Sequence, residues 1–251
     1  MRYSLLLNLL CIALLTLSTS SALAGAPFVT DDPEPVEVHH LEVNYAFTKT
    51  WRNNASSASV PSVDLNYGLN SDIQLHAQPK YAYEREGEEK NYGLDNTEIG
   101  VKYRFINNKS NSADFMVGIY PMLQLPTGNE RLGGGRGKAQ WFLPLWMQYN
   151  KDNWTFYGGT GYRVSNSIDS KNSWFFGGTA LYQWTDNLKV GGELFRETAT
   201  AIGENSTSGF NLGGIYDFND DYHLLFSVGK GLSNVSSTNK LTVYWALQVI
   251  Y

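Results

Sequence analysis

The feature that most constrains this chain is the alternation of apolar and polar residues in its last segment. Leu241, Val243, Trp245, Leu247, Val249 and Tyr251 alternate with Lys240, Thr242, Tyr244, Ala246, Gln248 and Ile250. Successive side chains of a β-strand point to opposite faces, so this segment predicts a strand with one apolar face. A terminal strand that ends on an aromatic residue is typical of barrels delivered to the outer-membrane assembly machinery, which we expect to be a partner.

The same period of two recurs upstream and predicts about twelve strands of about ten residues, as an outer-membrane barrel requires. We expect them near residues 38–49, 60–69, 73–84, 94–105, 114–125, 138–149, 154–164, 174–184, 188–198, 208–217, 222–230 and 240–251. Turn-forming clusters at residues 70–72, 107–109, 150–152, 186–187 and 219–220 join every second pair of strands. Short periplasmic turns, long external loops and two periplasmic termini are therefore expected.

The first 24 residues have the three parts of a secretory signal peptide: Arg2, an apolar run over residues 5–17, and small residues ending at Ala24. The run is shorter than the ~20 residues of a spanning helix, which favours cleavage after Ala24 over an anchor. Cys11 is the only cysteine, so the mature chain is expected to have no thiol. The expected domains are a signal peptide (1–24), a periplasmic N-terminal segment (25–37) and a transmembrane barrel (38–251).

Composition separates this barrel from other classes of protein. The longest apolar run after Ala24 covers only residues 141–147, too short for a spanning helix, whereas a barrel needs only every second residue apolar. A soluble β-sandwich or lipocalin-like barrel would alternate too, but 14% aromatic and 17% charged residues favour the membrane barrel. The slightly acidic balance argues against nucleic acid as a partner. We predict an all-β chain that forms a single antiparallel transmembrane β-barrel, surrounded by the lipids of the bacterial outer membrane.

Several sequence blocks resemble a known family. They read PFVTDDPEPVE from Pro27, TEIGVKYRF from Thr97, LPTG from Leu125, GRGKAQWFLPLW from Gly135, GELFRET from Gly192, GFNLGGIYDF from Gly209 and HLLFSVGKG from His223. In this order they resemble the bacterial family named for the MetA pathway of phenol degradation, whose members are often described as outer-membrane transporters. The resemblance covers nearly the whole mature chain and implies a barrel with a transport role. The family's name records a genomic association, and no site residues come with it.

If the apolar faces meet lipid, the opposite faces bring ionisable residues into the lumen. The lumen-lining candidates are Glu42, Asp64, His76, Lys80, Glu98, Lys102, Arg104, Arg163, Lys189, Glu193 and Asp217. They could form an aqueous pathway or a polar binding site for a small-molecule solute; alternatively, they pair across strands and fill a narrow interior. The acids of residues 31–35 could enter the periplasmic mouth and meet Lys80, Lys102 or Arg104, or that segment could remain a disordered leader.

Other patterns carry less chemistry. Residues 133–138 are glycine-rich but lack phosphate-loop spacing, which favours an external loop. The four histidines have neither Ser-His nor zinc-ligand spacing, so we expect no catalytic residue, metal or cofactor. Aromatic residues near strand ends predict girdles at the lipid–water boundaries: Trp51, Trp141, Trp154, Tyr182, Trp184, Tyr222 and Tyr251.

These observations favour an outer-membrane channel or transporter for passive uptake or efflux of small solutes, with hydrophobic or aromatic compounds as candidates. The first alternative is a non-conducting structural or partner-binding barrel. A barrel-embedded lipid-modifying enzyme ranks last, and we expect no enzymatic activity.

Overall fold

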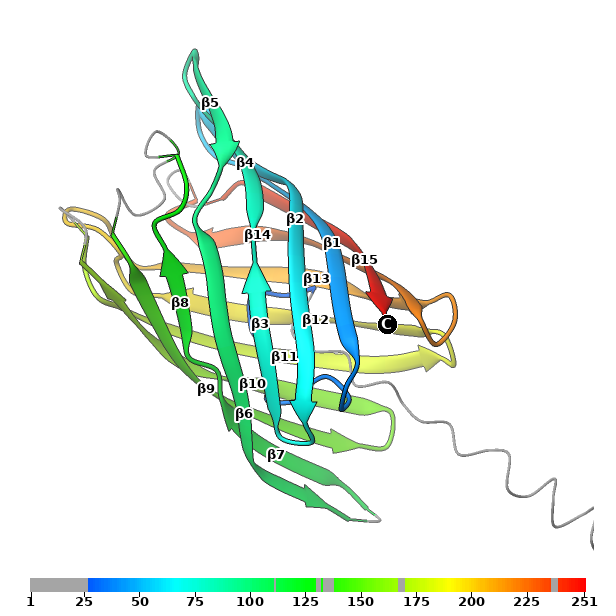
Figure 1. Cartoon of the computed structure of the whole chain (residues 1–251). Coiled ribbons are helices and arrows are strands. Elements are labelled where there is room, and N and C mark those ends of the chain that lie inside the picture. The colour runs from blue at the N-terminus through cyan, green and yellow to red at the C-terminus, as the bar shows by residue number, and fades with distance from the viewer. Residues whose placement is uncertain (1–26, 111, 130–131, 133–137, 167–169, 236–238) are drawn as a thin grey trace, which may run out of the picture.

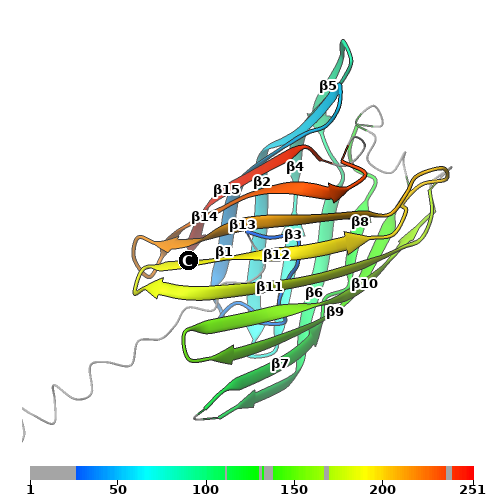
Figure 2. The same cartoon turned by 180° about the vertical axis from the view of Figure 1, so that it is seen from behind.

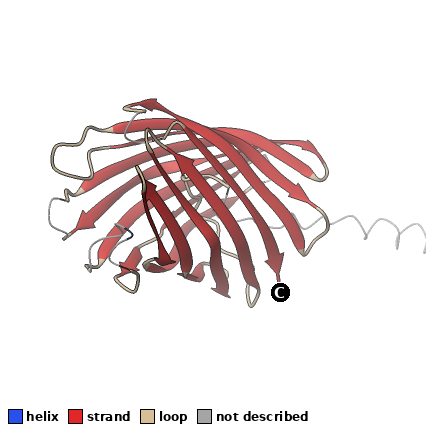
Figure 3. Ribbon diagram, turned by 90° about the horizontal axis from the view of Figure 1, so that it is seen from above, coloured by secondary structure: helices blue, strands red, loops and turns tan. Residues whose placement is uncertain are grey.

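Hydrogen bonding between the first and last strands closes the sheet into a barrel (Figures 1 and 2). The computed structural model describes residues 27–110, 112–129, 132, 138–166, 170–235 and 239–251. The expected signal peptide and most of the glycine-rich stretch lie outside these residues. Figure 3 shows strands and loops in the described part of the chain, where no helix is long and apolar enough to cross a membrane.

The strands are β1 (Leu41–Trp51), β2 (Ala55–Asn70), β3 (Ile73–Gln78), β4 (Lys80–Glu86), β5 (Glu89–Leu94), β6 (Thr97–Lys109), β7 (Asp114–Ile119), β8 (Met122–Leu125), β9 (Gln140–Lys151), β10 (Trp154–Ser165), β11 (Ser173–Thr185), β12 (Leu188–Glu197), β13 (Thr207–Asp217), β14 (Tyr222–Ser233) and β15 (Leu241–Ile250). Every neighbouring pair is antiparallel.

The fifteen strand segments form twelve barrel strands, here called staves, because three of the staves are each interrupted once. The stave of β3 and β4 breaks at Pro79, which has no N–H to donate to a ladder. The stave of β5 and β6 breaks at Asp95 and Asn96, and that of β7 and β8 at Tyr120 and Pro121. The twelve-stranded antiparallel barrel expected from the alternation is therefore confirmed, with interruptions that the alternation did not predict.

The two faces of the wall differ as a membrane barrel requires. Large apolar side chains such as Leu75, Val101 and Trp245 are exposed on the outside. Their sequence neighbours point inward, where Gln74 and Lys102 are buried. A soluble barrel would have the reverse arrangement, with apolar side chains buried and charges facing solvent. This distribution excludes the soluble alternative and places the chain in a membrane.

Two expected turns lie elsewhere in the structure. Residues 107–109 do not turn but continue β6, because Lys109 still pairs with Asp114 at the end of the β6–β7 ladder. Lys151 likewise belongs to β9, and the chain reverses at Asp152 and Asn153, where Asp152 has a φ of 52°. Asp tolerates this left-handed conformation better than most residues do.

The opposite rim carries an extension above the wall. β2 starts at Ala55, earlier than expected, and pairs in this upper part with β4, which in turn pairs with β5. These strands rise beyond the other staves at the top of Figure 1. Their tip turns at Gly87, whose φ of 59° favours glycine.

Aromatic rings line the outside near the turns. Trp154 lies 4.9 Å from Tyr182, and Tyr182 lies 6.3 Å from Trp184, measured between ring centroids. Tyr222 and Tyr251 are also exposed near the rim that carries the short turns. Amphipathic rings in this position match the girdle interpretation, since they contact lipid and water at once.

Candidate functional site in the barrel interior

Residues 27–37, here called the N-terminal segment, lie inside the barrel. Of the two alternatives that the sequence left open for this segment, entry into the barrel and a disordered leader, the contacts with the inner wall support entry (Figure 1, dark blue). On the β12 wall, the carboxylate of Glu193 accepts the backbone N–H groups of Val29 at 2.9 Å and Thr30 at 2.8 Å. On β14, the hydroxyl of Ser227 donates to the Pro27 carbonyl at 2.7 Å. One end of the segment is therefore anchored to this part of the wall.

Lys102 of β6 holds the middle of the N-terminal segment. Its ammonium lies 3.1 Å from a carboxylate oxygen of Asp31 and 3.4 Å from one of Asp32. It also donates to the Glu34 carbonyl at 3.4 Å. The Lys102 side chain is only 1% exposed, and a buried ammonium is stable only when it is paired in this way.

The sequence suggested Lys80, Lys102 and Arg104 as partners for the acids of residues 31–35. Of these three cations, only Lys102 forms ion pairs with them. Lys80 pairs with Asp95 at 3.6 Å, and Arg104 pairs with Asp72 at 3.2 Å. Both pairs belong to the wall, so they follow the alternative expectation that charges pair across strands.

Glu34 and Val36 connect the segment to two further strands. Gln148 of β9 donates to the Glu34 carboxylate at 2.9 Å, and Gln74 of β3 accepts the Val36 N–H at 2.9 Å. Burial raises the pKa of Glu34, and the nearby charge of Asp32 raises it further. The Gln148 hydrogen bond and, more weakly, two cations oppose this rise.

Small residues in the wall make room for the segment. A Cβ on Gly177 would lie 2.1 Å from Thr30 Oγ1, and one on Gly68 would lie 2.0 Å from the Glu37 carbonyl oxygen. Sequence reasoning missed these contacts, although a glycine inside a strand often marks the close approach of another backbone.

A cavity of about 290 Å³, here called the chamber, adjoins the N-terminal segment inside the barrel. Aromatic side chains from the wall, Tyr120, Phe142 and Trp146, line it together with Phe28 of the segment. Trp146 is 0% exposed, and its indole N–H has no hydrogen-bond partner among the described residues. The wall of the chamber therefore includes a buried donor without a partner among the described residues.

Charged side chains share the chamber with these rings. His76 lies between two carboxylates, with Nδ1 3.0 Å from Asp64 and Nε2 3.6 Å from Glu98. The Arg163 guanidinium stacks 4.4 Å above the ring centroid of Phe142. Apolar surface and charge of both signs thus meet in one space.

The eleven candidates for lining the lumen fall into several groups. Five of the eleven line the chamber: Asp64, His76, Glu98, Lys102 and Arg163. Glu193 anchors the N-terminal segment. Asp217 lies 2.7 Å from His223 near the periplasmic turns, and Glu42 accepts from Asn44 and Asn66. Lys80, Arg104 and Lys189 lie apart from the chamber. Neutral groups such as Gln74 and Gln148 were not singled out, although their inward register was visible.

Comparisons with known proteins agree with this architecture. A family model described as "Putative MetA-pathway of phenol degradation" matches residues 35–242. The fold is similar to an outer-membrane channel from Pseudomonas putida F1, with 16% identity, a TM-score of 0.66, and coverage of 88% of this chain and 98% of that one. It is also similar to the KdgM porin, with 12% identity, a TM-score of 0.55, and coverage of 84% and 98%. No curated protein matches the sequence. The barrel is thus of the bacterial outer-membrane type, and the chain lies in that membrane.

Proposed function

Because the chain belongs to the family named for the MetA pathway of phenol degradation, as its sequence blocks predicted, and closes into an outer-membrane barrel with an ionisable interior, we propose that it is a passive channel for small solutes. The chamber is the observation that carries the proposal, because it provides a polar and aromatic space inside the barrel. In this proposal, solutes pass through the chamber, beside the N-terminal segment.

The chamber favours small solutes with one ring and a polar group. A cavity of about 150 Å³ lined with apolar side chains holds benzene, so about 290 Å³ accommodates one substituted ring. Phe142 and Trp146 contribute aromatic rings to the lining, and the unpartnered Trp146 N–H becomes a donor to an acceptor on the solute once the indole ring turns toward the chamber. A hexose of similar size carries hydroxyl groups around its ring and therefore buries less apolar area against the aromatic side chains.

Swelling of proteoliposomes tests this proposal. The mature protein should admit hydroxylated or carboxylated single-ring compounds faster than hexoses. Trp146→Phe should reduce this preference, because it keeps an aromatic ring but removes the donor. Leu145→Met, on the outward side of the same strand, serves as the control. Equal swelling with all solutes in wild type and Trp146→Phe would remove the chamber from the proposal.

The packed interior also supports the second candidate, a non-conducting structural or partner-binding barrel. Tyr120, Met122, Phe142, Trp146 and Phe175 form a buried cluster within the lumen. Planar-bilayer recordings separate the two functions: deletion of residues 27–35 should raise the conductance of a channel. An absence of conductance in both proteins would favour the structural function.

A further inference from the structure

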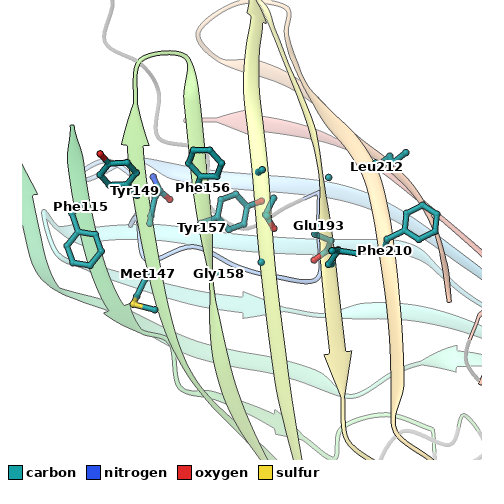
Figure 4. Close-up of a pocket in the computed structure, with 15 residues that line it drawn as sticks. Phe115, Met147, Tyr149, Phe156, Tyr157, Gly158, Glu193, Phe210 and Leu212 are labelled. Carbon is teal, nitrogen blue, oxygen red and sulfur yellow. The ribbon is translucent and has the colours of Figure 1, made fainter. Parts of the chain in front are cut away.

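The outer side of the wall contains a hollow where several outward side chains are missing or small. Gly158 lies opposite Gly178 in the β10–β11 ladder, and Ala180 lies opposite Gly192 in the β11–β12 ladder. Because side chains alternate across a strand, these four positions share the lipid side of the wall with the exposed Phe156. They form the floor of a hollow of about 730 Å³ (Figure 4).

Apolar side chains rise around this floor. Phe115, Met147, Tyr149 and Phe156 border it on the β7, β9 and β10 side, and Leu194, Phe210 and Leu212 border it on the β12 and β13 side. Figure 4 shows Phe115, Met147 and Tyr149 on one side of the hollow and Phe210 and Leu212 on the other. Glu193 also belongs to its lining, but its carboxylate is engaged with the N-terminal segment on the inner side of the wall.

At two of the four floor positions, an added side chain would clash with the wall itself. A Cβ on Gly158 would lie 2.4 Å from the Gly177 carbonyl oxygen, and one on Gly192 would lie 2.8 Å from that of Asn211. A space in the lipid-facing surface that no protein atom occupies loses dispersion contacts unless another molecule enters it. The hollow is continuous with the lipid-facing surface, so the molecules available there are hydrocarbon chains.

We propose that this hollow is a defined binding site for one acyl chain of a membrane lipid. Six strands from β7 to β13, about 4.8 Å apart, span about 24 Å. A lipid chain reaches across about half of a hydrocarbon layer of about 30 Å, so the hollow is long enough for one chain. No acidic or basic side chain of the border points outward, which matches a hydrocarbon better than a charged solute as the occupant. This inference does not depend on solute passage through the lumen.

Photocrosslinking locates such a chain directly. The mature protein is reconstituted with a palmitoyl phospholipid that carries a diazirine on its chain, and the crosslinked peptides are mapped by mass spectrometry. Labels should concentrate on β9 to β13 around the hollow. Uniform labelling around the whole barrel would show only non-specific lipid contact and would overturn the proposal.

A filled hollow provides the matched test. A Cβ on Gly178 meets no atom within 4 Å, so Gly178→Leu extends a side chain into the hollow from a position where the wall leaves open space. Labelling there should fall about tenfold, equivalent to about 1.4 kcal/mol. Val101→Leu adds apolar volume on β6, away from the hollow, and should leave labelling unchanged. Heat-modifiable migration on gels checks that each barrel is folded. Should Gly178→Leu not fold, the wild-type distribution of labels still decides the matter. Undiminished labelling in folded Gly178→Leu would refute the site.

Discussion

Glu193 is the contact whose removal should release the N-terminal segment most clearly. Its carboxylate accepts two backbone N–H groups of the segment, from Val29 at 2.9 Å and Thr30 at 2.8 Å, and it also accepts from Asn211. Glu193 is buried and anchors residues that lie 163 and 164 positions away in sequence. Glu193→Ala removes both anchoring bonds and, within the wall, the hydrogen bond from Asn211.

The expected magnitude follows from these two bonds. A hydrogen bond to a charged group contributes about 1.5–3 kcal/mol, so the pair contributes about 3–6 kcal/mol. Water enters the lumen and solvates the freed amides, which favours the lower end, about 3 kcal/mol. Each 1.4 kcal/mol is tenfold in an equilibrium constant, so local opening should become about a hundredfold more frequent. Glu193→Gln keeps one acceptor oxygen and should have a smaller effect, about tenfold.

Hydrogen–deuterium exchange of the refolded protein in detergent measures this opening. The amides of Val29 and Thr30 should exchange about a hundredfold faster in Glu193→Ala. Glu197→Ala is the matched control, because Glu197 lies on the same strand and bonds to Arg163 and Ser173. Unchanged exchange at Val29 and Thr30 in Glu193→Ala, or equal acceleration in the control, would refute the anchoring role.

Three further predictions concern the same segment. Gly177→Ala should weaken its docking by about 1–3 kcal/mol through overpacking against Thr30, whereas Gly178→Ala on the outer side should not; exchange of residues 27–34 measures both. Lys102→Met leaves Asp31 and Asp32 without their buried cation, so the segment should detach and single-channel conductance should rise; a conductance equal to that of wild type would contradict this. The raised pKa of Glu34 means that docking favours its protonated form. Its contribution to docking is therefore complete below the ordinary carboxyl pKa and is lost as pH rises through the raised value. Exchange protection, corrected for intrinsic rates, should fall over that interval in wild type but stay level in Glu34→Gln.

The strands were predictable because each carries its own signal. The alternating spacing of apolar residues such as Leu75, Val101 and Trp245 predicts the lipid-facing side of each strand, and the structure places these residues on the outside. Turn positions were less certain, as the continuation of β6 to Lys109 demonstrates, because polar residues such as Asn107 and Asn108 suit both a turn and a ladder beyond the membrane.

The candidate site was only partly predictable. The inward register of Lys102 and Glu193 could be read from the alternation, and an encounter between Lys102 and the acids of the segment was considered. The partners of Glu193 could not be foreseen, because backbone amides carry no sequence signature. The chamber could not be predicted from the sequence either, because it depends on how Trp146, Phe142 and Phe28 come together inside the barrel.

The sequence by itself determined that the chain forms a barrel and which face of each strand meets lipid. The reason is that hydrocarbon offers backbone groups no hydrogen-bond partners, so alternating strands must close on one another. Only the tertiary structure decided what fills the interior. Ser227 and Pro27 meet across 200 positions, and the glycines of the outer hollow come into register from three different strands. Contacts of that range depend on the shape of the closed wall, which no local pattern of residues encodes.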